Sequence, residues 1–156
     1  MEKRYKETEK FRYLILAVQR QGNKILKSYL KDIGITPSQA EVISILKNKQ
    51  PITLKDLGHL LICEDSSPSR LVERMVKDRL IERVKDENDS RFVRLALTPL
   101  GDEKYTLIMR AEADMYKVLE QLYTIAEFEE TNKMLGKLLL NTSLEQTMID
   151  RGFWED

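Results

Sequence analysis

The sequence predicts a mainly α-helical fold with one small β-hairpin. Residues 53–101 carry the best evidence, because two helical patterns joined by a polar turn are followed by two short strand patterns. The polar segment KDENDSR, residues 85–91, separates the strands and suits the tip of a hairpin. Two short helices followed by a hairpin make a winged helix-turn-helix, and duplex DNA is the usual partner of such a unit.

Length and composition indicate one globular domain. The chain has 156 residues, of which 42% are hydrophobic and 33% charged, enough to build a core. No apolar run approaches the roughly 20 residues needed to span a bilayer, and the charged N-terminus has no signal-peptide pattern. The single cysteine, Cys63, excludes an internal disulfide. We therefore expect a cytoplasmic protein with no membrane partner and no cofactor.

The net charge is zero, which is unusual for a nucleic-acid-binding domain, but the charges are unevenly distributed. Residues 1–35 hold nine Lys and Arg against four Asp and Glu, and residues 70–100 hold eight against six. Residues 101–156 hold six against twelve. Because the local field governs attraction to phosphate, the first two segments remain compatible with DNA binding.

The first three helices are predicted from apolar spacing and from start and stop signals. The first runs from about Lys6 to Tyr29 and is closed by Gly34. Thr36 followed by a proline opens the second, and Thr53 with Asp56 three residues later resembles a capping box for the third. Their apolar faces carry Phe11, Leu14, Val18 and Ile25, then Ala40, Ile43, Ile45 and Leu46, then Leu54, Leu57, Leu60 and Leu61.

A fourth helix should begin at Ser67-Pro68 and present two different faces. Its apolar side holds Leu71, Val72, Met75 and Val76, and its polar side holds Ser66, Arg70, Arg74 and Lys77. A helix that packs by one face and reads a DNA groove by the other needs this division.

The remaining elements are two strands and two helices. Residues 81–84 and 92–97 have strand character, the second with the alternation of a half-buried strand. Thr98-Pro99 opens a long helix to about Tyr123, and a final helix covers about 126–140 before a tail ending in Gly-Phe-Trp. The long helix has a heptad seam of Ile108, Ala111, Met115, Val118 and Leu122, which predicts a core and dimer seam.

Three motifs in these segments resemble the MarR (multiple antibiotic resistance regulator) family of bacterial winged-helix transcription factors. They are GITPSQAEVISIL at 34–46, SRLVERMVKDRLIERV at 69–84 and DENDSRFVRLALTPLG at 86–101. In this chain Lys77-Asp78-Arg79 stands where relatives usually have a glycine-containing turn, so the resemblance leaves the end of the fourth helix open.

The resemblance implies a homodimeric regulator, most often a repressor, that binds a pseudo-palindromic operator and can be released by a small-molecule effector. Residues 35–101 would form the DNA-binding lobe, and residues 1–34 and 102–156 the dimerisation helices. Arg91 would enter the minor groove, with Asp89 bracing it. The complete expected DNA-contact set is Ser66, Ser67, Ser69, Arg70, Arg74, Lys77, Asp89, Arg91 and Arg94. An effector cavity between the helices would include Tyr13, Met115 and Tyr116.

The sequence also allows an interaction module and a metal or thiol sensor as alternative functions. The same fold can serve as a protein-interaction module without an operator, and the zero net charge supports that alternative. His59 and Cys63 are four residues apart on an expected helix, so they could share a face as a metal or thiol sensor, although two ligands are too few for structural zinc. An enzyme has little support, because the sequence contains no Gly-rich phosphate loop and no Ser/His/Asp order.

Overall fold

The structure is a computed structural model that describes residues 1–63 and 67–155. It is mainly helical with one two-stranded antiparallel sheet, which confirms the predicted fold class. No helix among these described residues is long and apolar enough to cross a membrane. The elements in chain order are α1 (Glu2–Leu30), the 3-10 turn η1 (Lys31–Ile33), α2 (Pro37–Lys49), α3 (Leu54–Leu60), α4 (Pro68–Lys77), β1 (Ile81–Lys85), β2 (Val93–Leu97), α5 (Pro99–Leu122), α6 (Ile125–Gly136), the 3-10 turn η2 (Lys137–Leu139) and α7 (Ser143–Asp150).

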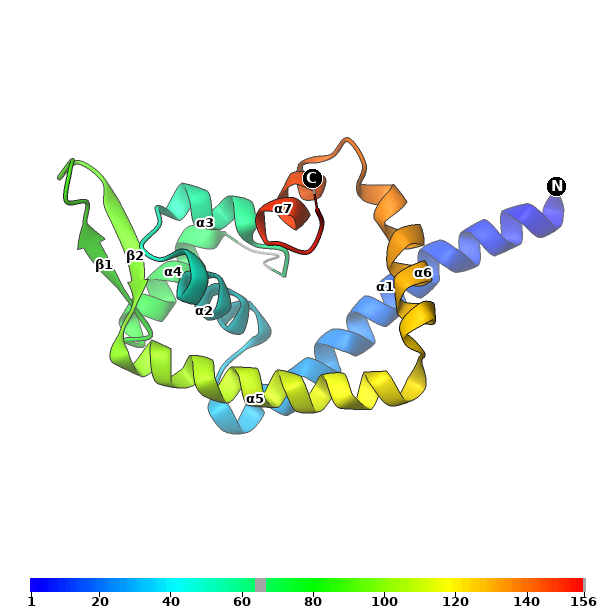
Figure 1. The fold of residues 1–156 in the computed structure, drawn as a ribbon, viewed down its shortest axis with the longest axis horizontal. Helices are drawn as coiled ribbons and strands as arrows, with labels where there is room; N and C mark the ends of the chain where they lie inside the picture. The colour runs from blue at the N-terminus through cyan, green and yellow to red at the C-terminus, as the bar shows by residue number, and fades with distance from the viewer. Residues whose placement is uncertain (64–66, 156) are drawn as a thin grey trace.

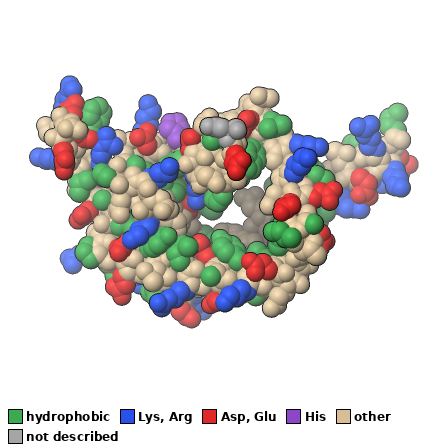
Figure 2. Space-filling model, viewed as in Figure 1, with side chains coloured by type: hydrophobic (Ala, Val, Ile, Leu, Met, Phe, Trp, Pro, Cys, Tyr) green, Lys and Arg blue, Asp and Glu red, His purple; other side chains and the backbone are tan. Residues whose placement is uncertain are grey.

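A lobe of α2, α3, α4 and the β1–β2 hairpin forms one end of the molecule (Figure 1). From this lobe α5 runs the length of the molecule to α6, and α7 returns to pack beside α3 (Figure 1). The C-terminal half of α1 packs against α5, and its N-terminus projects far beyond the rest of the chain (Figure 1). The space-filling view shows the molecule hollowed between the lobe and α6 (Figure 2).

Threonine side chains start the helices where the sequence predicts. The Thr36 hydroxyl accepts a hydrogen bond from the Gln39 amide (3.2 Å), and the Gln39 side chain accepts one from the Thr36 amide (3.1 Å), which completes a capping box. Thr98 accepts from the Gly101 amide (3.0 Å) and also donates to the Arg79 carbonyl (2.5 Å). At Thr53 the hydroxyl accepts from the Asp56 amide (3.1 Å), which is one half of the predicted box.

The core lies inside the lobe and extends to the helices beside it. Each fully buried aliphatic side chain contributes about 1.5–3 kcal/mol, so this cluster holds the lobe together and fixes it on α1 and α5. Its largest fully buried side chains are Leu30, Val42, Ile43, Leu46, Leu57, Met75, Ile81 and Ile108.

The fourth helix ends at Lys77 without a glycine. Arg79 adopts the left-handed conformation (φ 62°) that glycine usually supplies after a helix. The Leu80 amide then donates to the Met75 carbonyl (3.0 Å), and the Arg79 amide to the Val76 carbonyl (3.0 Å). An ordinary helix termination is thus achieved with an arginine, at a cost of about 1 kcal/mol.

The C-terminal prediction was wrong beyond residue 136. The expected final helix ends at Gly136 and is followed by η2, and the expected tail contains the additional helix α7. Asn141 in the left-handed region (φ 62°) separates the two helical segments, and the Glu145 carboxylate accepts from its amide (2.5 Å). The second strand also begins at Val93, one residue later than expected, because Phe92 belongs to the hairpin tip.

Candidate nucleic-acid interface

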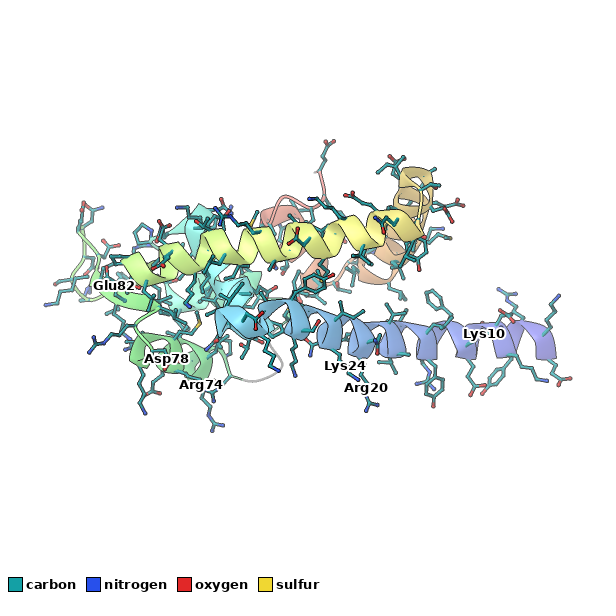
Figure 3. The ribbon with its side chains drawn as sticks, turned by 90° about the horizontal axis from the view of Figure 1, so that it is seen from below. Lys10, Arg20, Lys24, Arg74, Asp78 and Glu82 are labelled. Carbon is teal, nitrogen blue, oxygen red and sulfur yellow. The ribbon has the colours of Figure 1, made fainter. Side chains whose placement is uncertain are left out.

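The recognition-helix candidate α4 separates packing residues from exposed polar residues, as predicted. Leu71, Val72 and Met75 are buried against the lobe. On the opposite side Ser69, Arg70, Arg74 and Lys77 are exposed, and Figure 3 shows Arg74 pointing away from the lobe. In the described part of the chain, none of these three cationic side chains lies within 4.0 Å of a carboxylate oxygen. Their charges therefore face solvent.

The start of α4 presents two hydroxyl groups. Ser67 precedes the helix, and its Oγ lies 2.7 Å from the Oγ of Ser69, with both residues exposed. Ser67 does not use this side chain to cap the helix. Hydroxyl groups at the positive end of a helix dipole are suited to phosphate oxygens. Ser66, the third predicted serine, lies outside the described residues.

The hairpin forms the predicted wing. Its strands pair antiparallel from Ile81 opposite Leu97 to Lys85 opposite Val93. Ile52 adds a bridge to the outer side of β2, exchanging both backbone hydrogen bonds with Leu95 (3.2 and 2.7 Å). The base of the wing is therefore fixed to the segment between α2 and α3.

The Asp86 carboxylate organises the wing tip. Its Oδ1 accepts from the amides of Asn88 (2.8 Å) and Asp89 (3.0 Å), and its Oδ2 pairs with the Arg94 guanidinium. The bond from Arg94, followed by the bonds from the two amides, holds the pKa of Asp86 below its ordinary value. Arg94 thus stands at the base of the wing tip, and its contact with DNA stays a prediction.

Arg91 projects from the wing tip while its guanidinium is held by Asp89. Its Nε donates to Asp89 Oδ1 (3.0 Å) and its Nη2 to Oδ2 (2.7 Å), although the Arg91 side chain is 85% exposed. The hydrogen bond from Arg91 holds the pKa of Asp89 below its ordinary value. A carboxylate that orients the guanidinium fork leaves its outer edge free for a further acceptor.

The predicted effector residues lie on two helices. Tyr13 is exposed on α1, in a groove whose other lining residues, including Leu16 and Lys24, also belong to α1. Met115 and Tyr116 are on α5 and do not line that groove. Burial, followed by the charge of Glu112, raises the pKa of Tyr116. A shared cavity for the three residues stays a prediction.

His59 and Cys63 do not share a helix face, and that expectation was wrong. Helix α3 ends at Leu60 and the backbone at Leu61 is extended, so Cys63 lies beyond the helix. Cys63 is exposed as a residue, but partial desolvation of its thiol raises the pKa to about 11, and the neighbouring Glu41 carboxylate adds to this effect. A thiol with this pKa is a poor nucleophile and metal ligand at neutral pH. Within the described residues, no three His, Cys, Asp or Glu side chains are grouped as a metal site requires.

A buried polar cluster around Glu41 was missed by the sequence reasoning. Glu41 is on α2, and its Oε1 accepts from the amides of Ile62 (3.0 Å) and Cys63 (2.9 Å). Its Oε2 lies 2.6 Å from Nη1 of Arg151. A single acidic residue inside the apolar segment AEVISIL, residues 40–46, was the available signal, since a buried carboxylate needs partners.

Comparisons with known proteins agree with this geometry. A family model described as a winged helix DNA-binding domain matches residues 35–101. The multiple antibiotic resistance protein MarR of Salmonella typhimurium is 28% identical over 127 residues, covering 81% of this chain and 88% of that protein. The crystal structure of a MarR variant from Escherichia coli, complexed with operator DNA, superposes with a TM-score of 0.77 at 25% identity, covering 85% of this chain and 96% of that one.

These comparisons support a winged-helix regulator that resembles the MarR family. A second relative, the HTH-type transcriptional regulator YsmB of Bacillus subtilis, is 28% identical over 127 residues, covering 81% of this chain and 84% of that protein. The Staphylococcus aureus MepR–DNA complex shares the fold with a TM-score of 0.75 at 22% identity, over 83% of this chain and 96% of that one. The predicted MarR resemblance is confirmed.

Proposed function

We propose that this protein, which resembles the MarR family, is a sequence-specific DNA-binding transcriptional regulator that represses by occupying a pseudo-palindromic operator. The observation that carries the proposal is one lobe presenting an exposed Arg/Ser/Lys face on α4 together with the projecting Arg91 of the wing. A related MarR with the same fold is seen on operator DNA. A regulator of this kind acts where the chromosome is, so we place it in the cytoplasm.

The two parts of the interface suit different grooves. A helix of α4's width fits the major groove, where Arg70 and Arg74 can reach base edges or flanking phosphates, and Lys77 can contact phosphate. The Arg91 guanidinium suits the strong negative potential of a narrow minor groove. Asp89 holds that guanidinium by hydrogen bonds from its Nε and Nη2 before binding, which reduces the entropy lost when it inserts.

The exposed apolar side chains outside the lobe support a homodimer. Such large apolar surfaces are rare on monomers and mark protein interfaces. They lie on the helices of residues 1–34 and 102–156, for which we keep the proposed dimerisation role. Among them are Leu14 and Val18 on α1, Val118 and Leu122 on α5, and Met134 on α6. Two-fold symmetry then predicts half-sites about 10 bp apart, or a multiple of that distance.

Release by an effector belongs to the same proposal. A small molecule bound near Tyr13, Met115 and Tyr116 would favour the dimer state in which the two recognition helices no longer match the half-site spacing. Titrating phenolic ligands against the protein–operator complex tests this step. Operator affinity unchanged by every such ligand counts against it.

The interface is tested by selecting bound fragments from random DNA and then measuring the affinity of variants for the selected site. We expect Arg70→Ala and Arg91→Ala each to weaken binding by about 1–3 kcal/mol at fixed salt. Arg110→Ala removes the same charge from an exposed position on α5 and serves as the control. Wild-type affinity in both test variants would refute the proposed contacts.

A protein-interaction module without an operator is the second candidate, favoured by the zero net charge. The two candidates differ in salt dependence. A dimer that contacts several phosphates loses roughly a factor of 10³ or more in affinity between 50 and 200 mM salt, because bound counterions are released. Binding that is insensitive to salt, or confined to protein partners, would favour the second candidate.

A further inference from the structure

The C-terminal strap, which we define as α7 and residues 151–154, docks on the helix-turn-helix of its own chain. Figure 1 shows α7 beside α3. The buried Thr147 hydroxyl donates to the His59 carbonyl at the end of α3 (2.8 Å). This bond ties the strap to the helix that precedes the recognition helix.

One buried ion pair links the strap to the backbone after α3. Arg151 Nη1 lies 2.6 Å from Glu41 Oε2, and the two side chains are only 16% and 5% exposed. The other oxygen of the same carboxylate accepts from the Ile62 and Cys63 amides. Glu41 therefore joins Arg151 to the backbone just after α3, at Ile62 and Cys63.

Arg151 stabilises the buried Glu41 carboxylate in its charged form and so keeps the strap docked on the helix-turn-helix. A carboxylate buried to this extent is stable as an anion only when it is paired and hydrogen-bonded. Arg151 also lies close enough to Glu112 of α5 to lower its pKa, against the larger raising effect of burial. Removal of the guanidinium would leave both partly or fully buried carboxylates without this neighbouring cation.

The far end of the strap reaches α6. The Arg151 guanidinium lies over the Phe153 ring, 5.1 Å from its centroid, and Phe153 borders a hollow with Ile45 and Leu60. The Trp154 indole packs on Gly136 so closely that a Cβ at that position would lie 2.9 Å from the ring. The strap therefore connects the end of α6 with the helix-turn-helix.

We propose that Arg151 is a positioning residue for DNA binding: through Glu41 it fixes the backbone at Ile62 and Cys63, just after α3, and operator binding requires the strap to be docked. The inference rests on the proposed function, and it adds a residue that touches no DNA. When the strap is released, the fraction of molecules with a correctly placed α4 falls, and the apparent operator affinity falls by the same factor.

The test compares Arg151→Gln with the wild-type protein in the full chain. We expect faster hydrogen exchange at the Ile62 and Cys63 amides, and an operator affinity about tenfold weaker at fixed salt if only a tenth of the molecules remain competent. Arg151→Lys restores the charge and should recover part of both effects. Lys137→Gln, an exposed position in η2 that loses the same charge, should leave both unchanged.

Two results would overturn the proposal: exchange that accelerates while affinity stays at the wild-type value, or an affinity loss no larger than that of Lys137→Gln. If Arg151→Gln does not fold, Thr147→Val removes the hydroxyl that bonds to the His59 carbonyl and to the Ser143 carbonyl within α7, and it should cause a smaller loss in both measurements. Trp154 is the only tryptophan, so its emission reports whether the strap is docked. Wild-type protein that binds no duplex would refute the proposed function. The exchange measurement needs no DNA, so it tests separately whether Arg151 and the strap hold the Ile62 and Cys63 backbone.

Discussion

At Gly101 the long helix α5 lies directly against the backbone of the lobe. A Cβ at this position would lie 2.0 Å from the Leu80 carbonyl oxygen and 3.2 Å from Leu97 Cδ2. The obstacle is backbone at the start of β1, which the wing and the end of α4 hold in place. Steric exclusion of a Cβ therefore requires glycine here, because the backbone of Gly101 in the first turn of α5 is otherwise ordinary helix.

We expect Gly101→Ala to lower the free energy of unfolding by about 3 kcal/mol, because an atom is forced into a packed backbone. Urea denaturation of the purified protein measures the change. Gly58→Ala is the control, since its Cβ would meet only Pro68 Cγ at 3.8 Å, an ordinary contact in a helix that favours alanine. Equal losses in the two variants would contradict the argument.

Cys63 should be nearly inert towards alkylation at neutral pH. With a pKa of about 11, only about one thiol in 10³ is ionised at pH 8. The rate of iodoacetamide labelling measured against pH should therefore rise towards a midpoint near 11. Glu41→Gln should lower that midpoint towards the ordinary value of 9.0, and Glu112→Gln, whose effect on the thiol is smaller, should lower it less. A wild-type midpoint below 9 would restore the thiol-sensor alternative.

At the scale of elements, the wing depends on the charged form of Asp86. Asp86→Asn weakens its pair with Arg94 and its bonds to two tip amides, so the Asn88 and Asp89 amides should exchange faster and operator affinity should fall several-fold. Because the folded-state pKa of Asp86 is depressed, its contribution is present above the ordinary value of 3.8 and is lost as the pH falls below it. The variant's wing amides should thus be insensitive to acid in this range, and a wild-type-like pH response would contradict the assignment.

Helices with local start signals were predictable from the sequence, whereas α7, which lacks such a signal, was not. Thr36-Pro37 and Thr98-Pro99 carry their own caps, so α2 and α5 begin where expected. Helix α7 is eight residues long, and Thr142 before it makes no side-chain cap. Its docking depends on the bonds of Thr147 and Arg151 to residues about 90 and 110 positions earlier, and periodicity cannot reveal such contacts.

The same distinction applies to the candidate site. The outward face of α4 follows from helical spacing, and the Asp89–Arg91 pair is only two residues apart, so both could be anticipated. The Glu41–Arg151 pair joins residues 110 positions apart, which no local pattern connects. Arg79 also shows the limit of local rules, since an arginine holds the left-handed position in the segment where relatives usually have a glycine-containing turn.

At the scale of the whole molecule, the exposed apolar residues at the end of the α5 seam predict that a charged substitution there will dissociate the dimer. Leu122 is 65% exposed in the single chain, and burying such a side chain in an interface gains about 1.5–3 kcal/mol. Leu122→Lys should therefore shift the protein towards monomer in sedimentation velocity and weaken operator binding in parallel. Gln121→Lys adds the same charge one residue away at an exposed polar position. A monomeric wild-type protein would contradict the dimer itself.

Thr98 joins the wing and α5 through one side chain, because its hydroxyl caps the helix and also bonds to the backbone before β1. The hairpin therefore has no separate hinge at this junction, so it moves together with α5. Helix α5 has 24 residues and is about 36 Å long, so a tilt of about 6° around its distant end displaces the wing by about 4 Å. That displacement is comparable with the width of a minor groove, about 6 Å. If Arg91 enters the minor groove as proposed, a small change where the two subunits meet would be enough to withdraw it while the lobe itself stays rigid.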